Sequence, residues 1–226
     1  MINERTGEVF SIASENAPVE LCTISKAVAE VAGLRISHFS LAPGTDIGAE
    51  TYPAPKLWLV ASGEIAATDG NGGRTPLAPG DLYTTPAGRN IGAATSTGGI
   101  YTEIKLGKDT EMNNILQPGK AFALKDAIPY ADGRIVNMDI ASNPSMKFVL
   151  MSFDAGTGLS EHSAPGDALV FALDGAATIG YEGTEHQIKA GETFKFAKNG
   201  RHWVKAETRF KMALLLVLDS TAAIGV

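Results

Sequence analysis

The chain has 226 residues, of which 44% are hydrophobic, and it contains 25 glycines and 11 prolines. This composition is typical of a globular, turn-rich protein and excludes a disordered chain. The net charge of −6, without any block of Lys or Arg, argues against a surface that binds nucleic acid. The length allows either one large domain or two smaller domains with separate cores.

Cysteine content and hydropathy predict a soluble cytoplasmic protein. The single cysteine, Cys22, excludes an internal disulfide and a cysteine-built metal cluster. Its apolar neighbours predict a buried thiol. The longest apolar run, residues 212–218, is far shorter than the roughly 20 residues that span a bilayer. Residues 1–5 are polar and do not resemble a secretory signal, so we expect no membrane partner.

Short strands separated by turns are predicted along the whole chain. Residues 25–31 are ambiguous between a helix and an edge strand, and the extended pattern that follows favours the strand. Further β-branched and aromatic segments lie at residues 57–60, 100–106, 169–173, 194–196, 202–204 and 211–218. Glycine-rich turns lie at 69–73 and 182–184, and residues 122–128 predict a short helix or an entry strand. Strands at this spacing indicate a β-sandwich or barrel.

One pattern of two glycine-punctuated motifs occurs twice, and every interval within each motif is equal in the two copies. The first copy reads Gly44-x5-Glu50-x-Tyr52-x3-Lys56-x6-Gly63, then Gly80-x5-Pro86-x-Gly88-x2-Ile91. The second reads Gly156-x5-His162-x-Ala164-x3-Ala168-x6-Gly175, then Gly191-x5-Ala197-x-Asn199-x2-His202. Two copies are too few for a solenoid, which needs at least about three repeats, so each copy must close on itself. We therefore predict one domain at 1–107, a linker at 108–119 and a second domain at 120–226.

The two motifs resemble the signature motifs of the cupin superfamily, G-x5-H-x-H-x3,4-E-x6-G and G-x5-P-x-G-x2-H-x3-N. The match covers both halves, so the chain resembles a two-domain cupin, or bicupin. The resemblance implies an all-β fold of two tandem jelly-roll (double-stranded β-helix) barrels. In this family, the two histidines and the glutamate of the first motif and the histidine of the second bind a divalent metal inside the barrel.

The second copy keeps only part of this ligand set. His162 and His202 occupy histidine positions, but Ala164 and Ala168 stand where the second histidine and the glutamate are expected. One interpretation is a C-terminal metal site for Fe, Mn, Ni or Zn. The other is that no metal binds, and the histidines bind an anionic or polyhydroxyl ligand or act as acid and base. The small side chains of Ala164 and Ala168 also predict a ligand pocket there.

A third ligand for the second copy would have to be a carboxylate. Asp167 and Glu161 are the nearest candidates, but each lies next to a motif position. Adjacent residues of a strand face opposite sides, so neither carboxylate points inward unless a bulge re-aims it.

The first copy departs completely from the metal pattern. Glu50, Tyr52, Lys56 and Ile91 occupy its four ligand positions, so we expect a degenerate pocket without a metal. Lys56 is predicted to place its cation where a metal would sit, paired with Glu50. On this interpretation the N-terminal barrel is mainly a scaffold.

Two functions remain open from the sequence. The first is a small-molecule protein with its ligand pocket in the C-terminal barrel, acting as a metal-dependent enzyme of dioxygenase or isomerase type through His162 and His202. The alternative is a non-catalytic, metal-free module that binds or senses a small ligand. Dimerisation is common in folds of this kind, so a homodimer is also expected.

Overall fold

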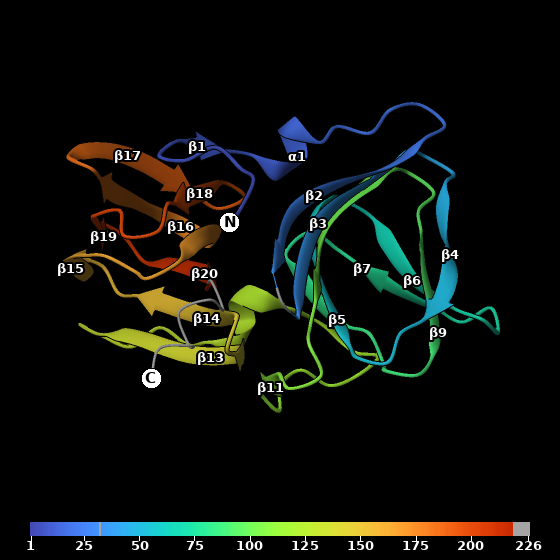
Figure 1. Cartoon of the computed structure of the whole chain (residues 1–226). Coiled ribbons are helices and arrows are strands. Elements are labelled where there is room, and N and C mark those ends of the chain that lie inside the picture. The colour runs from blue at the N-terminus through green and yellow to red at the C-terminus, as the bar shows by residue number, and fades with distance from the viewer. Residues whose placement is uncertain (32, 219–226) are drawn as a thin grey trace. The chain divides into compact units, whose positions relative to one another are not determined.

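The computed structural model describes residues 1–31 and 33–218 of the chain (Figure 1). Regular structure in these residues is almost entirely β-strand. The exceptions are helix α1 (Ile12–Glu15) and a short 3-10 helix (Leu124–Ala127). The predicted all-β fold class is therefore confirmed.

The chain divides into two compact units, which we name after the repeat copy that each contains. The first-repeat unit comprises Ile12–Thr110 and Asn114–Leu124. The second-repeat unit comprises Met1–Ser11, Glu111–Asn113 and the chain from Lys125 onward. This division differs from the predicted ranges, because both the N-terminal residues and part of the expected linker are assigned to the second copy.

Two short strands explain this difference. Strand β1 (Val9–Phe10) pairs with β18 (Thr193–Phe196), which adds the start of the chain to the sheet of the second-repeat unit. Strand β11 (Glu111–Met112) pairs with β13 (Ile135–Asn143) and adds part of the expected linker to the same sheet.

The first-repeat unit consists of two antiparallel sheets. The six-stranded sheet has the order β12-β8-β5-β10-β3-β2, and the four-stranded sheet has the order β4-β9-β6-β7. The strands of the larger sheet are β2 (Thr23–Val31), β3 (Leu34–Leu41), β5 (Lys56–Gly63), β8 (Asp81–Thr84), β10 (Gly99–Lys105) and β12 (Ala121–Ala123). Those of the smaller sheet are β4 (Asp46–Thr51), β6 (Ile65–Asp69), β7 (Arg74–Leu77) and β9 (Asn90–Ala94). The two sheets face each other in Figure 1, so inward side chains of both meet between them.

Apolar side chains fill only part of the space between these sheets. The core cluster of the first-repeat unit consists of Leu41, Trp58, Val60, Ile65, Ala67, Leu77, Tyr83, Ala93 and Tyr101. Strand β2 confirms the strand that was favoured at residues 25–31. Cys22, just before β2, is exposed, so the prediction of a buried thiol was wrong. The exposed neighbours Val19, Leu21 and Ile24 show why: this apolar stretch lies at the surface instead of facing the core.

The second-repeat unit is built around one long strand, β16 (Asp167–Tyr181). The first half of β16 pairs with β18 and β20, and the second half pairs with β17 and β19. The remaining strands are β14 (Met146–Phe153), β15 (Gly158–His162), β17 (Thr184–Lys189), β19 (His202–Lys205) and β20 (Phe210–Val217). Its core cluster consists of Phe153, Ala168, Val170, Ala172, Ala177, Ile179, Ile188, Phe194, Phe196, Val204, Ala206, Phe210 and Met212.

The repeated glycines have a conformational explanation. Positive φ angles occur at Gly44, Gly63, Gly80, Gly156, Gly175 and Gly191. Such angles are accessible to glycine at little steric cost, so the shared spacing records where both copies turn. At Gly63 and Gly175 an added Cβ would also collide with a backbone carbonyl. The pattern therefore specifies backbone geometry and leaves the chemistry of the interior open.

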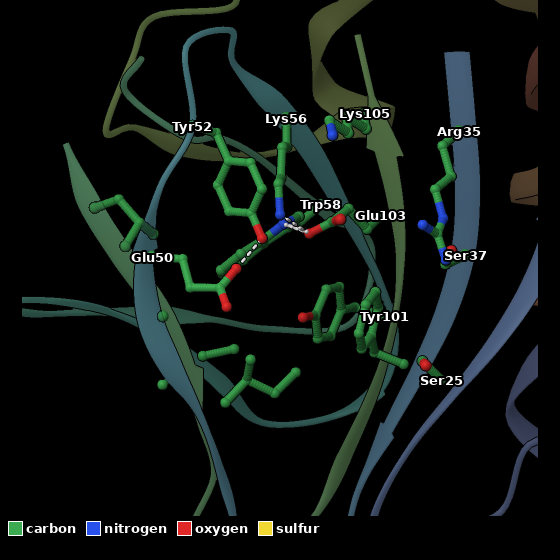
Figure 2. A pocket seen from close by; sticks show the side chains of 16 residues that line it. Ser25, Arg35, Ser37, Glu50, Tyr52, Lys56, Trp58, Tyr101, Glu103 and Lys105 are labelled. Atoms are coloured by element: carbon green, nitrogen blue, oxygen red, sulfur yellow. Dashed lines mark hydrogen bonds and ion pairs between the residues drawn. The ribbon is translucent and has the colours of Figure 1, made fainter. Parts of the chain in front are cut away.

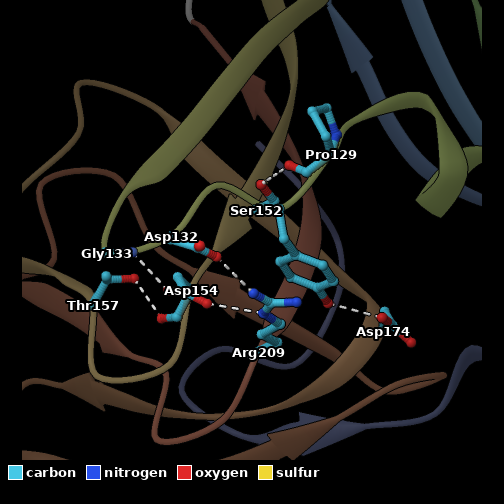
Figure 3. A network of polar contacts seen from close by, with 9 residues as sticks. Pro129, Asp132, Gly133, Ser152, Asp154, Thr157, Asp174 and Arg209 are labelled. Atoms are coloured by element: carbon cyan, nitrogen blue, oxygen red, sulfur yellow. Dashed lines mark hydrogen bonds and ion pairs between the residues drawn. The ribbon is translucent and has the colours of Figure 1, made fainter.

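A polar network ties residues 129–134 to the strands of the second-repeat unit (Figure 3). Arg209 donates from Nε to Asp154 Oδ1 at 2.9 Å and from Nη2 to Asp132 Oδ1 at 3.0 Å. The Tyr130 hydroxyl donates to Asp174 Oδ2 at 2.8 Å. The backbone N–H of Gly133 and the guanidinium of Arg209 hold the pKa of the Asp154 carboxyl below its ordinary value.

Candidate functional site

A cavity of about 290 Å³ lies inside the first-repeat unit (Figure 2). Its walls come from β3, β5 and β10 of the larger sheet and from β4 and β9 of the smaller sheet. All four predicted first-copy positions, Glu50, Tyr52, Lys56 and Ile91, line it. The structure therefore brings these residues together around a hollow interior.

Strand register places charged residues of β5 and β10 on the same wall. Lys105 lies opposite Lys56 in the ladder, and Glu103 lies opposite Trp58. Alternate residues of a strand face the same side, so Tyr101, Glu103 and Lys105 all face the cavity. These three residues were not predicted as site residues, because residues 100–106 have the composition of an apolar strand. Their alternation with Ile100, Thr102 and Ile104 is the signal that would have revealed them.

Lys56 is the central cation of the site. Its side chain is 9% exposed, and its Nζ lies 3.0 Å from Oε2 of Glu103 and 3.4 Å from the centroid of the Tyr52 ring. The indole N–H of Trp58 donates to the same Glu103 oxygen at 2.9 Å. The predicted pairing of Lys56 with Glu50 was therefore wrong, because the partner comes from β10, 47 residues further along the chain.

Glu50 has a different partner, the Tyr52 hydroxyl, which donates a hydrogen bond to its Oε2. This hydrogen bond, together with burial and the negative charges of Glu50 and Glu103, raises the pKa of Tyr52 to about 12. The phenol therefore stays protonated at neutral pH and does not add a negative charge to the cavity.

Aromatic rings form an apolar wall of the cavity. The rings of Phe39 and Tyr101 stack with their centroids 5.1 Å apart, and Trp58 lies 5.0 Å from Tyr101. Burial raises the pKa of the Tyr101 phenol well above its ordinary value. Phe39 and Tyr101 were not predicted as site residues, because an aromatic residue in a strand is usually part of the core.

Two more cations line the exposed side of the cavity. The side chains of Arg35 and Lys105 are both exposed to solvent. Lys105 Nζ lies 5.5 Å from the centroid of the Tyr52 ring. Within the described chain, neither cation forms an ion pair with a carboxylate. Both were missed by the motif comparison, because neither occupies a motif position.

The two predicted histidines of the second-repeat unit do meet. His162 and His202 are cross-strand partners of β15 and β19, with ring centroids 4.3 Å apart. Each ring contacts a backbone carbonyl through Nδ1 at 2.8 Å, His162 at Ser160 and His202 at Gly200. A carbonyl only accepts, so both Nδ1 atoms carry the proton in these contacts, and the neutral rings keep a lone pair on Nε2. Burial and the neighbouring His162 lower the pKa of His202.

The donor set around this pair does not complete a metal site. Asp167 accepts hydrogen bonds from the N–H groups of Ile2 and Lys198 and lies 3.7 Å from Lys195 Nζ, and Glu161 pairs with Arg201. Both carboxylates are thus engaged elsewhere, as strand parity predicted. In the part of the chain that is described, no three His, Cys, Asp or Glu side chains are grouped in a way that could hold a metal ion. Two imidazoles alone fall short of the three or more ligands of a typical protein site.

The packing around Ala168 argues against the pocket predicted there. Ala168 is 1% exposed and belongs to the apolar core cluster. Its cross-strand partner is Phe196, whose ring stacks on that of His202 at 4.0 Å. The volume that the short side chain vacates is therefore next to aromatic core residues. Ala164 is only half-buried and lies in the loop between β15 and β16.

Comparisons with known proteins agree with this fold. The cupin domain family model matches residues 149–218. The structure is similar to that of a Cupin 2 conserved barrel domain protein from Leptotrichia buccalis, with a TM-score of 0.84 and 27% identity over 96% of this chain and 99% of that chain. It is also similar to salicylate 1,2-dioxygenase from Pseudoaminobacter salicylatoxidans in adducts with gentisate, with a TM-score of 0.63 and 14% identity over 93% of this chain and 80% of that chain. The comparison with curated proteins gives no match.

No helix among the described residues is long and apolar enough to cross a membrane. The family match and the structural neighbours both support the resemblance to the cupin superfamily. The chain is thus an all-β protein of cupin-like fold, with a cupin domain recognised in its second repeat.

Proposed function

We propose that the chain is a metal-free small-molecule binding protein made of two cupin-type domains, with its ligand site in the cavity of the first-repeat unit. The observation that carries this proposal is Lys56. An ammonium group stands at a position where the family resemblance implies a metal ligand, and it faces a cavity of about 290 Å³. This volume is at the lower end of the range for ligand pockets, about 300–1,000 Å³, which suits a small ligand.

The polar groups of the cavity support a binding role. A buried ion pair such as Lys56 with Glu103 contributes little net stability compared with apolar packing of the same volume. The second-repeat unit has an apolar residue, Leu214, where the first has Glu103, as the cross-strand register shows. Stability alone therefore does not explain the ion pair of Lys56 and Glu103 in the first repeat. This ion pair lies beside an aromatic wall of the kind found in ligand sites.

The similar dioxygenase structure contains gentisate, a small organic molecule. The 14% identity with that protein reflects a shared fold, and its activity is not transferred here. It supports the narrower proposal that a cupin-like interior of this kind takes a small organic ligand.

A second candidate is a metal-dependent enzyme at His162 and His202. It is favoured by one observation, the contact of each Nδ1 with a backbone carbonyl. Carbonyl contacts of this kind orient histidines that ligate a metal through Nε2. Because this donor set contains two ligands only, we place the metal-free function first. The C-terminal pocket, the homodimer and the cytoplasmic location remain predictions.

The two candidates can be separated in one set of samples. The indole N–H signal of Trp58 in NMR reports on the cavity, and the imidazole C–H signals of His162 and His202 report on the second site. We expect small aromatic fragments to shift the Trp58 signal, and Ile91→Trp to block this by filling the cavity. A double variant, His162→Ala with His202→Ala, should bind fragments like the parent protein.

Elemental analysis of untagged protein purified without chelator completes this test. We expect no stoichiometric Fe, Mn, Ni or Zn. Near-stoichiometric metal that both histidine substitutions remove, together with fragment shifts confined to the His162 and His202 signals, would reject the metal-free function and establish the second candidate.

A further inference from the structure

We infer that the ligand of the first-repeat cavity is a small organic anion with a flat apolar body, whose anionic group is bound by the Lys56 ammonium. This inference rests on the proposed function and adds the charge class of the ligand. It follows from three features of the cavity: the Lys56 ammonium has a hydrogen-bond donor left, both carboxylates already accept hydrogen bonds from the protein, and two cations on the exposed side form no ion pair in the described chain.

Lys56 has hydrogen-bonding capacity left. An ammonium group carries three N–H donors. The described contacts of its Nζ are one carboxylate oxygen, on Glu103 at 3.0 Å, and one aromatic face, on Tyr52 at 3.4 Å from the ring centroid. Figure 2 shows Lys56 reaching into the space between these two residues, where its remaining donor can meet a ligand oxygen.

Both carboxylates of the cavity already have donors. The Glu103 oxygen Oε2 accepts from Lys56 and from the indole of Trp58. Glu50 accepts from the hydroxyl of Tyr52. A cationic ligand that approached Glu103 would be repelled by the ammonium group of Lys56, which lies 3.0 Å from Glu103 Oε2. An anionic ligand meets no such repulsion, because it can accept a hydrogen bond from Lys56 while Glu103 keeps its place.

The exposed side of the cavity has an excess of positive charge. Arg35 and Lys105 line it without a carboxylate partner in the described part of the chain. They make the cavity locally cationic in a protein whose net charge is −6. A local field of this sign raises the concentration of small anions at the entrance and speeds their association.

The remaining wall suits a flat apolar body. The stacked rings of Phe39 and Tyr101 and the neighbouring indole of Trp58 present an aromatic surface on one side. Ile47 and Ile91 lie on the opposite strands, β4 and β9. A planar ring between them would bury apolar surface while its anionic group reaches Lys56.

The test uses three probes of nearly equal size and different charge: benzoate, benzyl alcohol and benzylamine. Each is titrated into the full-length protein, and binding is followed at the indole N–H signal of Trp58. We expect benzoate to bind on the order of tenfold more tightly than benzyl alcohol, because a hydrogen bond to a charged group is worth that ratio or more. We expect no shift with benzylamine.

The key variant is the double substitution Lys56→Met with Glu103→Gln. It removes the cation but leaves no unpaired buried charge, and the introduced amide oxygen can still accept from the Trp58 indole. We expect benzoate affinity to fall about tenfold or more and benzyl alcohol affinity to stay within about twofold. The matched control is Lys147→Met. It removes a cation from the second repeat, at the position in β14 that corresponds to Arg35 in β3. It should leave all three affinities unchanged.

A second variant keeps the test independent of folding. Arg35→Gln with Lys105→Gln changes exposed residues only, so we expect a folded protein that binds benzoate about threefold more weakly and with less dependence on salt. Equal binding of benzyl alcohol, or preferred binding of benzylamine, at Trp58 would overturn the anion assignment while leaving the binding function intact. Failure of all three probes to shift the Trp58 signal would count against the proposed function itself.

Discussion

The two repeats share their turns and strand register but differ in what fills their interiors. In the first, β10 presents Tyr101, Glu103 and Lys105 to a cavity. In the second, β20 has the corresponding residues Met212, Leu214 and Leu216, which pack in or against the apolar core. The correspondence follows from the ladders, in which Lys105 lies opposite Lys56 and Leu216 lies opposite Ala168.

This comparison shows that motif positions alone do not locate the site. The second copy keeps the two histidines, yet the stacking of Phe196 on His202 fills the space beside them. The first copy has lost every histidine, yet it encloses the cavity. Much of this difference comes from residues that are not motif positions. They are Phe196 in the second copy and Glu103 in the first.

The largest loss of stability is expected when a core side chain is removed from the apolar interior of the second repeat. Phe196→Ala is expected to lower the free energy of unfolding of the second-repeat unit by about 3–5 kcal/mol, because it leaves a large void in a packed core. At the corresponding position of the first repeat, Thr85→Ala removes only a hydrogen bond from the N–H of Lys56 to Oγ1, 2.8 Å long, and should cost about 1 kcal/mol. Urea unfolding followed at the indole signals of Trp58 and Trp203 measures each unit separately. Equal losses in the two units would contradict the contrast between hollow and filled interiors.

A charged side chain placed in the apolar interior of the second repeat should have the next largest effect on stability. Leu214→Glu places a carboxylate on the apolar core of the second-repeat unit and is expected to cost about 2–3 kcal/mol at neutral pH. Adding Ala168→Lys recreates the pairing of Glu103 with Lys56 and should recover part of this loss. The same urea measurement at Trp203 applies. If Leu214→Glu costs nothing, this interior is more accessible to water than its burial indicates.

A smaller effect concerns Tyr52 at alkaline pH. Its raised pKa means that the folded protein holds the phenolic proton more tightly than the unfolded chain does. The resulting stability is fully present below pH 10.0 and is lost as the pH rises from there to about 12. Tyr52→Phe should therefore cost less than about 1 kcal/mol at neutral pH, and this difference should shrink above pH 10.0. Unfolding curves of parent and variant at several pH values test this, and a difference that does not depend on pH would contradict it.

The smallest effect is expected at the exposed network of Figure 3. The lowered pKa of Asp154 contributes stability that is present above the unfolded pKa of about 3.9 and is lost as the pH falls through the folded value. Arg209→Gln should remove part of it and leave the hydrogen bond from the Gly133 N–H in place. Thermal unfolding of the two proteins should differ slightly at neutral pH and converge in acid, and added salt should reduce the difference. A variant that loses more stability in acid than at neutral pH would show that Arg209 acts in another way.

The fold class and the positions of the turns could be predicted from residues along the chain. Six motif glycines with positive φ angles place the same bends in both copies, and such angles leave a recognisable spacing because few other residues adopt them easily. Strand parity predicted that Asp167 and Glu161 point away from the histidine pair, and both carboxylates have ion-pair partners in the folded chain. These are local properties of the backbone, so they can be read from neighbouring residues.

The cavity of the first repeat and the pairing of its charges depend on which strands are adjacent in the folded chain. Lys56 pairs with Glu103 because β5 and β10 are adjacent in the sheet, although the two residues are 47 positions apart in the chain. Ala168 lies in the apolar core, and its cross-strand partner is Phe196. Long-range register sets both outcomes, and a single sequence without the pairing of its strands does not specify that register.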